Sequence, residues 1–515
     1  MATITPEMDS FSLERVLQAL EREREARWQR GPEALRLKLH WRAQATKRCL
    51  HVLPNETILE LGGGSGLLTE QLGHVFRGEN PITSLVFSEE FLDKSLARNI
   101  PCAILLYARN LSTDLGLAQF DYVIGSGMLW HRRLPECLAL IYRVLKPGGR
   151  ILFFEPNFLF PVRVFHQMTS SRGRMNTLSV RVDRVIQAVS HQEFTHIDIA
   201  PHDMVSCRLG PRIMRRLQAK AVLLEHMPGA RLFCASMCVS ARKPGARSRP
   251  VTSLATRSEL HNTVSVVLPA HNEAPNLAAL IEQLISLYGS YIHEIIVVND
   301  NSKDATEAVV QTIAMAEPRV HLLNRTPPSG VGRALKDGYR AATGQYILSM
   351  DCDFVDILPE LRELFEVVAD GHEGAIGSRF SHESILTDYP FWKLFFNRLC
   401  HLLIKVFLLD RVRDISNNLK LYRAEILKNL EIQSPHFAAN LETGLGPLLA
   451  GRDIVEVPIS WSNRTFAMGE SRFDVRKVGV DYVQAFFRCC WRKWEIDRRG
   501  LFQRMLRRRH PSVRQ

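Results

Sequence analysis

Two aspartates separated by one residue, Asp351 and Asp353, are the clearest candidates for catalytic chemistry in this sequence. They follow the apolar run 345–350, which is typical of a buried strand. Such a carboxylate pair suits Mg²⁺ or Mn²⁺, because these hard cations prefer oxygen ligands and are usually held by one or two carboxylates together with substrate phosphates. We therefore predict a catalytic metal site here, and a turn or a helix cap is the alternative for an isolated pair.

Other polar loops follow predicted strands in the same half of the chain. The loops 269–273, 299–304 and 329–332 carry polar or glycine residues, and Arg379 closes a further strand. Open α/β sheets bind ligands at the carboxyl ends of their strands, so these loops predict a binding pocket around the metal site. The Arg379 guanidinium suits a phosphate group. Each loop taken alone is also typical of an ordinary strand–helix connection.

In this order, the segments resemble the inverting family 2 glycosyltransferases of the GT-A fold over roughly residues 262–475, and among them the dolichol-phosphate mannosyltransferases. Segments 414–423 and 457–473 resemble the acceptor-side and closing motifs of that subgroup, whereas Val355 stands where relatives often carry Gln. The resemblance implies a nucleotide-sugar donor whose base and ribose contact the first two loops and whose diphosphate contacts the metal and the arginines. The implied nucleotide-sugar-binding residues are Pro269, His271, Glu273, Val298, Asp300, Asp351, Cys352, Asp353, Arg379, Arg464 and Arg472.

The nature of the acceptor decides whether the reaction needs a base. The metal and the arginines would stabilise the leaving nucleoside diphosphate. A polyprenyl phosphate acceptor, which the resemblance favours, is already an anion and needs no base. The alternative, a hydroxyl of a glycan or small molecule, needs a carboxylate, and Glu442 is then the predicted catalytic base. A helix-capping role is the alternative for Glu442.

A second set of residues lies in the first half of the chain, where Glu60 and the glycine-rich turn 62–66 follow an apolar strand. Glycines in such a turn permit positive φ and let the backbone approach a ligand closely. Together with the helix-end, turn and strand pattern at 145–152, this turn resembles the class I S-adenosylmethionine-dependent methyltransferases over roughly residues 50–243. The resemblance implies a seven-stranded sheet with S-adenosylmethionine as cofactor. The implied cofactor-binding residues are Glu60, Gly62, Gly64, Gly66, Glu89 and Asn110.

Two positions depart from the methyltransferase pattern. The acidic residue that usually ends the second strand and holds the ribose is replaced by Val86, with Glu89 a little beyond, and the usual acidic adenine contact falls near Asn110. A non-catalytic, methyltransferase-like binding domain is therefore the alternative to an active enzyme. His131 follows the fourth predicted strand, where an acceptor-side residue and a structural histidine are equally reasonable interpretations.

The motifs predict an α/β protein with two tandem doubly wound domains. The predicted divisions are a helical segment 1–49, to which we assign no chemistry, a methyltransferase domain 50–243, a linker 244–261, a GT-A domain 262–480 and a basic tail 481–515. Strands are expected in the first domain at 57–61, 84–87, 103–107, 121–124, 149–154, 194–199 and 232–240. In the second domain they are expected at 263–268, 294–298, 320–323, 346–350 and 374–377.

Composition points to a polyanionic partner. The 515 residues carry a formal net charge of +12, although the hydrophobic content of 46% is ordinary. No nucleic-acid recognition motif is present, so we expect an anionic membrane surface, contacted by the apolar but Lys- and Arg-interrupted segment 391–409 and the basic tail. Packing of that segment on the core is the alternative. The 10 Cys without a zinc pattern, the absence of a signal-like stretch and the absence of a long apolar run predict a cytoplasmic protein, peripheral at the cytoplasmic face of the membrane.

Overall fold

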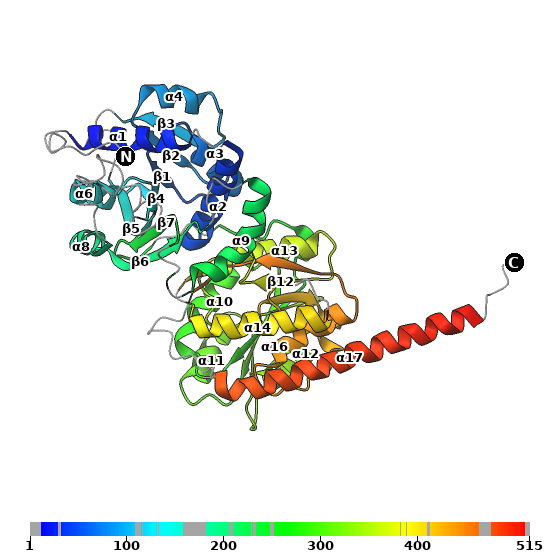
Figure 1. Ribbon diagram of the computed structural model, residues 1–515. Coiled ribbons are helices and arrows are strands. Elements are labelled where there is room, and N and C mark those ends of the chain that lie inside the picture. Colours follow the sequence, from blue (N-terminus) through cyan, green and yellow to red (C-terminus); the bar gives the residue numbers. More distant parts are fainter. Residues whose placement is uncertain are drawn as a thin grey trace. The chain divides into compact units, whose positions relative to one another are not determined.

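The computed structural model divides the chain into two compact units, Met1–Thr252 and Ser253–Gln515, and each is described by itself (Figure 1). The boundary falls inside the predicted linker 244–261. The described residues are 12–28, 32–108, 115, 117–129, 131, 133–157, 182–204, 210–227, 229, 233–247, 252–381, 383–387, 389–408, 413–462 and 475–509.

Unit 1 is built on a seven-stranded sheet with the order β3-β2-β1-β4-β5-β7-β6. Neighbouring strands run parallel, except that β7 is antiparallel to both β5 and β6. The sheet confirms the α/β fold and the strand number that the sequence predicted for this domain. The strands are β1 (Ile58–Leu61), β2 (Ile82–Val86), β3 (Ala103–Tyr107), β4 (Phe120–Ser126), β5 (Leu145–Pro156), β6 (Thr195–His202) and β7 (Ser236–Arg242).

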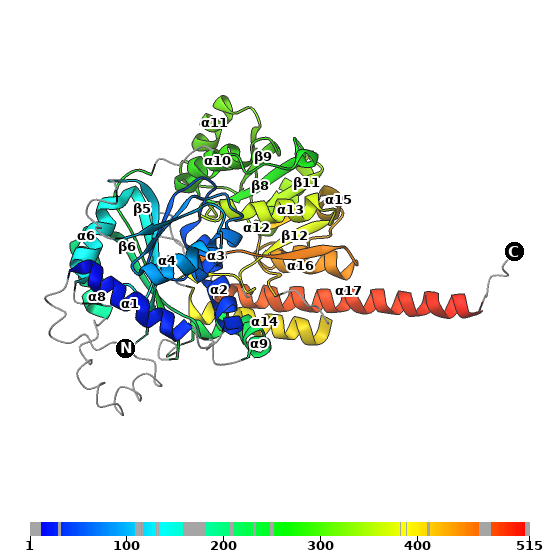
Figure 2. The ribbon, with the colours of Figure 1, turned by 90° about the horizontal axis from the view of Figure 1, so that it is seen from above.

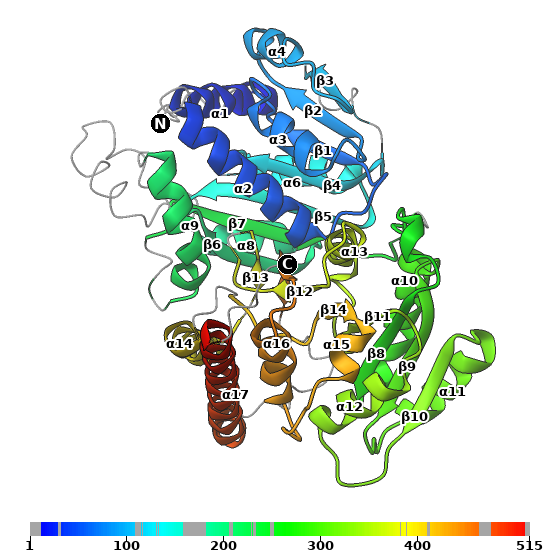
Figure 3. The ribbon, with the colours of Figure 1, turned by 90° about the vertical axis from the view of Figure 1, so that its right-hand side faces the viewer.

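Helices cover both faces of this sheet, as right-handed crossovers require. The chain moves outward from β1 to β3 and then returns to β4 on the other side of β1, so the helices before and after this reversal lie on opposite faces. Helix α2 runs beside α3 and α9, whereas α6 packs with α8 (Figure 3). The helices are α1 (Leu13–Trp28), α2 (Pro32–Leu50), α3 (Leu67–Val75), α4 (Glu89–Leu96), α6 (Leu134–Val144), α8 (Val182–His191) and α9 (Pro211–Glu225).

The N-terminal helices belong to the core of unit 1. Strand β4 is buried along its whole length, and α6 presents Leu134, Leu138 and Ile141 at helical spacing to the same apolar cluster. Helix α1 adds Leu17 to this cluster, and α2 packs Trp41 near α9. The sequence analysis treated residues 1–49 as a segment outside the methyltransferase domain, and this boundary was wrong because both helices bury apolar side chains against it.

Unit 2 contains a second seven-stranded sheet, with the order β10-β9-β8-β11-β14-β12-β15. Strand β14 is antiparallel to β11 and β12, and the other pairs run parallel. The sequence analysis missed β14, because its four residues include Lys420 and Arg423 and form no apolar run. The strands are β8 (Val264–Ala270), β9 (Ile292–Asn299), β10 (Val320–Asn324), β11 (Tyr346–Ser349), β12 (Gly374–Ser378), β14 (Lys420–Arg423) and β15 (Ile454–Pro458); β13 (Leu386–Thr387) and β16 (Trp461–Ser462) form a separate pair.

The direction of the chain across this sheet also reverses, between β10 and β11. Right-handed crossovers therefore put α12 on the face opposite to α10 and α11, and the reversal leaves β8 and β11 side by side at the switch point. The helices are α10 (Ala274–Tyr288), α11 (Thr306–Ala316), α12 (Val331–Ala341), α13 (Leu361–Ala369), α14 (Phe391–Leu408), α15 (Ala424–Lys428), α16 (Ala439–Leu449) and α17 (Val475–Arg509).

Helices α14 and α17 lie side by side (Figure 2) and share one buried cluster with α16. The ring of Phe407 on α14 lies 5.9 Å from the ring of Phe486 on α17. Because Ala485, Phe486 and Cys489 are buried, the basic segment predicted as a tail from residue 481 begins inside a packed helix, and that boundary is corrected here. Among the described residues, no helix is both long and apolar enough to cross a membrane.

Candidate functional site

The aspartate pair follows β11 at the centre of the unit 2 sheet, next to the switch point with β8. A chain of hydrogen bonds orients Asp351: its Oδ1 accepts from Asn418 Nδ2 at 2.8 Å, and Asn418 Oδ1 accepts from Ser349 Oγ at 2.9 Å. The Tyr339 hydroxyl on α12 donates to the same Ser349 oxygen at 2.9 Å. Asn418, Ser349 and Tyr339 are almost fully buried, so they hold one carboxylate of the pair in a fixed direction. The sequence analysis did not identify these three residues.

The donor set of this pair fits a hard divalent cation. Asp351 and Asp353 are half-buried, so their carboxylates can reach a ligand at the edge of the sheet. The described residues contain no cluster of three or more His, Cys, Asp or Glu that could enclose a metal ion. Two carboxylates are nevertheless typical of Mg²⁺ sites, in which water and substrate phosphates complete the octahedron. These residues could therefore hold a cation whose other ligands come from a diphosphate.

The residues predicted for the nucleotide lie at the neighbouring strand ends. Pro269 of β8 stands opposite Val298 of β9, and Cys352 is buried with its Sγ 3.5 Å from the Pro269 carbonyl oxygen. His271 Nδ1 lies 2.6 Å from the carbonyl oxygen of Asp300. The structure therefore brings these five residues together at the same edge of the sheet as the aspartate pair.

The carboxylate of Asp300 ties this edge to the start of α12. It accepts from the Gly330 N–H at 2.6 Å and forms an ion pair with Arg325, which also binds Asp337. Gly330 precedes α12 with a φ of 156°, and a Cβ atom there would overlap the Pro435 carbonyl oxygen. The turn 329–332 is thus held between Asp300 and the segment before α16. This close packing explains why position 330 is a glycine.

Glu273 is buried at the start of α10. Its N–H donates to Thr306 Oγ1 at 2.9 Å, and its Oε2 accepts from Asn276 Nδ2 at 2.6 Å. These contacts connect the loops after β8 and β9. The predicted ribose or base contact of Glu273 remains a prediction, since the described contacts are within the protein.

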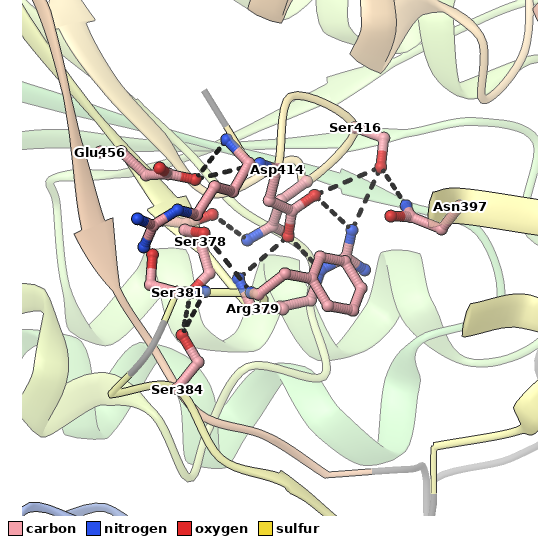
Figure 4. A network of polar contacts seen from close by, with 12 residues as sticks. Ser378, Arg379, Ser381, Ser384, Asn397, Asp414, Ser416 and Glu456 are labelled. Carbon is pink, nitrogen blue, oxygen red and sulfur yellow. Dashed lines mark hydrogen bonds and ion pairs between the residues drawn. The ribbon is translucent and has the colours of Figure 1, made fainter. Parts of the chain in front are cut away.

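Arg379 follows β12 and is paired with Asp414 (Figure 4). Its Nε and Nη2 donate to the two carboxylate oxygens at 2.7 and 2.9 Å, and its backbone N–H donates at 3.0 Å. Burial opposes the charges of the pair, but their attraction prevails, so the pKa of Arg379 is raised and the pKa of Asp414 is lowered to about 2. Because the guanidinium already binds a carboxylate in bidentate fashion, the predicted phosphate contact of Arg379 stays a prediction.

A second arginine beside this pair was missed by the sequence analysis. Arg398 of α14 donates to Asn397 Oδ1 at 2.7 Å and to the Arg413 carbonyl at 2.6 Å, and its guanidinium lies 3.9 Å from the centre of the Phe380 ring. Burial lowers its pKa to about 10. The signal in the sequence is the basic residue inside the apolar run 391–409. The contact with Arg413 connects α14 to the residue directly before the predicted acceptor-side segment 414–423.

Glu442 of α16 is buried and receives five hydrogen bonds. Oε2 accepts from the N–H groups of Gln433 and Ser434 at 3.0 and 2.9 Å. Oε1 accepts from Ser434 Oγ at 2.9 Å and from Arg488 Nε and Nη2 at 3.1 and 2.8 Å. An ionised carboxylate offers about four lone-pair sites, so this one has no capacity left for a substrate proton. The geometry speaks against the predicted catalytic base and favours a structural role.

Arg464 and Arg472, assigned to phosphate, and Asn110, assigned to the adenine, lie outside the described residues.

In unit 1, the predicted cofactor residues divide into two groups. Gly62, Gly64 and Gly66 have positive φ angles of 73°, 56° and 76°, as expected of a tight ligand-binding turn. Glu60 is buried beside them, and burial raises its pKa; its Oε2 accepts from Thr69 and Ser84 hydroxyls at 2.6 and 2.8 Å. Glu89 is the first residue of α4 and its side chain is exposed, so the structure does not bring it to this turn.

The ligand-facing side of the turn is covered by α1. Glu21 Oε1 accepts from the Gly64 N–H and Oε2 accepts from the Phe87 N–H, both at 3.0 Å, and the segment 61–66 is buried. Among the described residues, Glu21 thus takes backbone donors that would otherwise face S-adenosylmethionine, so this arrangement of the turn does not fit the bound cofactor. His131 is also buried, and burial lowers its pKa to about 4, which fits a structural histidine.

Two family models match the chain. Residues 59–153 match the model described as a methyltransferase domain, and residues 265–431 match glycosyl transferase family 2. The first match spans β1 to β5 with the glycine turn, and the second spans β8 to α15 with the aspartate pair.

Characterised relatives resemble the second unit. A dolichol-phosphate mannosyltransferase of Pyrococcus furiosus is 28% identical over 240 residues, which is 46% of this chain and 66%, just under two thirds, of that protein. A polyprenol monophosphomannose synthase of Mycolicibacterium smegmatis is 27% identical over 254 residues, covering 46% of this chain and 93% of that protein. Among solved structures, glucosyl-3-phosphoglycerate synthase of Mycobacterium tuberculosis in complex with Mn²⁺, uridine diphosphate and glucosyl-3-phosphoglycerate is 18% identical, with a TM-score of 0.36 over 48% of this chain and 86% of that one. The chain therefore contains a methyltransferase domain followed by a family 2 glycosyltransferase domain that is similar to polyprenol-phosphate mannosyltransferases.

Proposed function

We propose that unit 2 transfers a sugar from a nucleotide sugar to a polyprenyl phosphate, with inversion at the anomeric carbon and with a divalent cation at Asp351 and Asp353. The observation that carries this proposal is the aspartate pair at the β8–β11 switch point, with one carboxylate oriented by Asn418 and with the predicted nucleotide residues at the adjacent strand ends. The similarity to two enzymes named for mannosyl transfer to dolichol or polyprenol phosphate supports it.

The residues of unit 2 then act mainly by binding and orientation. Asp300 and His271, connected at 2.6 Å, form the wall for the nucleoside, and Asp351 and Asp353 would hold the cation against the donor diphosphate. When bound, the cation neutralises the charge that develops on the leaving diphosphate. The acceptor oxygen attacks the anomeric carbon from the face opposite the leaving group, and the protein aligns the two reactants.

The environment of Glu442 supports a phosphate acceptor over a hydroxyl acceptor. A hydroxyl must lose a proton during the attack, and the carboxylate predicted to take it already accepts five hydrogen bonds within the protein. A phosphate monoester is an anion at neutral pH and needs no such base. The glycan or small-molecule alternative is therefore the weaker of the two.

The location of a polyprenyl acceptor requires contact with a bilayer, and α14 and α17 supply a suitable surface. We call it the α14–α17 apolar face. Its exposed side chains are Trp392, Phe395, Phe396, Leu399, Leu402, Leu403, Val406 and Phe407 on α14 and Val480, Val483, Phe487, Trp491, Trp494 and Ile496 on α17.

This face combines the two features of a helix that lies in a membrane interface. Outside it, the only other large hydrophobic side chain exposed among the described residues of unit 2 is Met315, so the apolar surface is concentrated on these two helices. Lys405 and Arg498 are exposed on the same helices, and Arg498 stacks over Trp494 at 5.3 Å. Aromatic side chains beside basic ones favour an anionic bilayer as the occupant.

The proposal is tested by incubating the full chain with a panel of labelled nucleotide sugars and polyprenyl phosphate in detergent, with Mn²⁺ or with a chelator. We expect metal-dependent label in the lipid phase, and its near-complete loss in Asp351→Asn and Asp353→Asn. Asp356→Asn, an exposed aspartate of the same loop, is the matched control and should transfer normally. Donor hydrolysis without lipid labelling would retain the donor site and reject the polyprenyl acceptor.

A further inference from the structure

Helix α1 buries charged side chains in the interior of unit 1 in addition to the apolar Val16 and Leu17. Glu21, Arg24 and Glu25 are spaced three and four residues apart and therefore share one side of the helix. Their exposed fractions are 0%, 3% and 2%. Charged side chains are almost never buried to this extent unless they have specific partners. The groups that contact these three side chains therefore determine why charged residues are tolerated here.

Those partners are the hydrogen-bond donors at the predicted cofactor site. The Glu21 carboxylate bridges the Gly64 N–H, in the turn after β1, and the Phe87 N–H, directly after β2. Glu25 Oε2 accepts from Ser65 Oγ at 2.7 Å. Backbone N–H groups at the carboxyl ends of adjacent parallel strands are the groups that bind anionic and hydroxyl parts of a nucleotide-like ligand. The carboxylates of α1 thus occupy positions that such a ligand would need.

The space above the turn is filled as well. A Cβ atom on Gly64 would overlap Glu25 Oε1, and one on Gly62 would lie 3.3 Å from Arg24 Nη1 and 2.8 Å from Met128 Sδ. Arg24 Nη1 also donates to the Ser126 carbonyl at 3.3 Å, at the end of β4. The close backbone approach that glycines permit is used by the chain itself, and the Glu21 side chain is fully buried there.

We propose that α1 is an intramolecular plug of the methyltransferase domain, so that S-adenosylmethionine and docked α1 exclude one another. The cofactor binds only to the fraction of molecules in which α1 has left the turn, and its apparent affinity falls in proportion to that fraction. This inference rests on the methyltransferase assignment of unit 1 and is independent of the glycosyl transfer proposed for unit 2.

The opposite role for α1 makes the opposite prediction. Since Val86 stands where an acidic ribose contact is usual, Glu21 could instead supply that carboxylate from α1 and strengthen cofactor binding. The plug is favoured because each Glu21 oxygen already accepts a hydrogen bond from a backbone N–H and because the whole turn is buried. Removal of the carboxylates distinguishes the two roles. If α1 is a plug, the cofactor should bind more tightly, and if Glu21 contacts the ribose, the cofactor should bind more weakly.

Isothermal titration of the full chain with S-adenosylmethionine provides the test. We expect Glu21→Ala combined with Glu25→Ala to bind at least tenfold more tightly than the wild type. Glu14→Ala combined with Glu23→Ala removes the same charge from partly exposed positions of α1 and should bind like the wild type. Weaker or unchanged binding by the first double variant would overturn the proposal, as would the absence of binding by every variant at millimolar ligand.

Hydrogen exchange on the wild-type chain covers the case in which the double variant fails to fold. With saturating S-adenosylmethionine, the amides of residues 13–28 should exchange faster than in the free protein, because the ligand displaces α1. Unchanged or slower exchange in this helix would contradict the plug. Transfer by unit 2 is measured on the same samples, so a failed glycosyltransferase proposal is recognised separately.

Discussion

At the scale of single residues, Asn418 is the contact that sets the direction of the Asp351 carboxylate. Residues that orient a metal ligand typically change metal affinity by about 10–100-fold when they are removed. We expect Asn418→Ala to weaken Mn²⁺ binding, measured by electron paramagnetic resonance in the presence of nucleoside diphosphate, within that range. Asn429→Ala, an exposed asparagine after α15, should leave Mn²⁺ binding unchanged. Equal affinities in the two variants would show that Asp351 needs no orienting contact.

The sequence located the residues whose chemistry depends on local spacing. Asp351 with Asp353, and the glycines of the turn 62–66, occur within a few positions of each other after a recognisable strand. Asn418 lies 67 residues from Asp351, and Glu21 lies 43 residues before Gly64, so neither pairing has a local signal. These contacts exist because antiparallel β14 enters the sheet next to β11 and because α1 folds back onto the turn after β1.

At the scale of elements, Glu442 joins α16 to the segment before it and to α17 through Arg488. Glu442→Gln removes hydrogen bonds to a charged group, which are worth about 1.5–3 kcal/mol each, so the free energy of unfolding should fall measurably in denaturant titrations. Transfer to polyprenyl phosphate should persist in the variant.

The kinetic result decides between this structural role and the base role. Loss of a general base would lower kcat about 100-fold or more while leaving stability nearly intact. Glu431→Gln, on the exposed surface nearby, is the control for both measurements. A folded Glu442→Gln protein with such a loss of kcat would restore Glu442 as the base and favour a hydroxyl acceptor.

Docking of α1 should depend on pH through Glu21. Burial raises the pKa of Glu21 to about 7 from an ordinary value of 4.5; the Arg24 charge opposes this shift and the Glu25 charge adds to it. The docked helix therefore holds a proton that the released helix loses, so docking is strongest below pH 4.5 and weakens as the pH rises to about 7. Apparent S-adenosylmethionine affinity should rise over this interval, by at most about tenfold per pH unit because one proton is linked.

Glu21→Gln provides the comparison for this pH dependence. An amide does not titrate, so the affinity of the variant, measured by isothermal titration between pH 5.5 and 7.5, should vary much less than that of the wild type. An identical pH profile in both proteins would assign the dependence to another group, with Glu25 as the next to substitute.

At the scale of the whole molecule, the two units share one type of architecture, a seven-stranded and mostly parallel sheet covered by helices. In each sheet the first three strands run outward from a central strand and the fourth lies on the other side of that strand, and each candidate site lies at this switch point. The alternation of strands and helices in the sequence was enough to predict two doubly wound α/β domains, because right-handed crossovers leave few other ways to cover both faces, but it did not predict the order of the strands. The outer boundaries were predicted less well: α1, α2 and the start of α17 carry many charged residues, and only their buried faces attach them to the cores.

The net charge of +12 and the α14–α17 apolar face should contribute separately to membrane binding, and salt distinguishes them. Electrostatic attraction to an anionic leaflet is screened over about 10 Å at 0.1 M salt and about 3 Å at 1 M salt, whereas apolar insertion is not weakened by salt. Sedimentation of the full chain with vesicles containing phosphatidylserine should therefore fall between these salt concentrations to a residual level and not to zero.

The residual binding at 1 M salt is the part that depends on the apolar face. Trp392→Ser combined with Phe396→Ser should remove most of it, since these exposed rings supply large apolar area at the start of α14. Met315→Ser, which removes an even more exposed apolar side chain from α11, should retain this residual binding. If salt abolished binding of the wild type completely, charge alone would hold the protein at the membrane, and the exposed rings of α14 and α17 would need a protein partner instead.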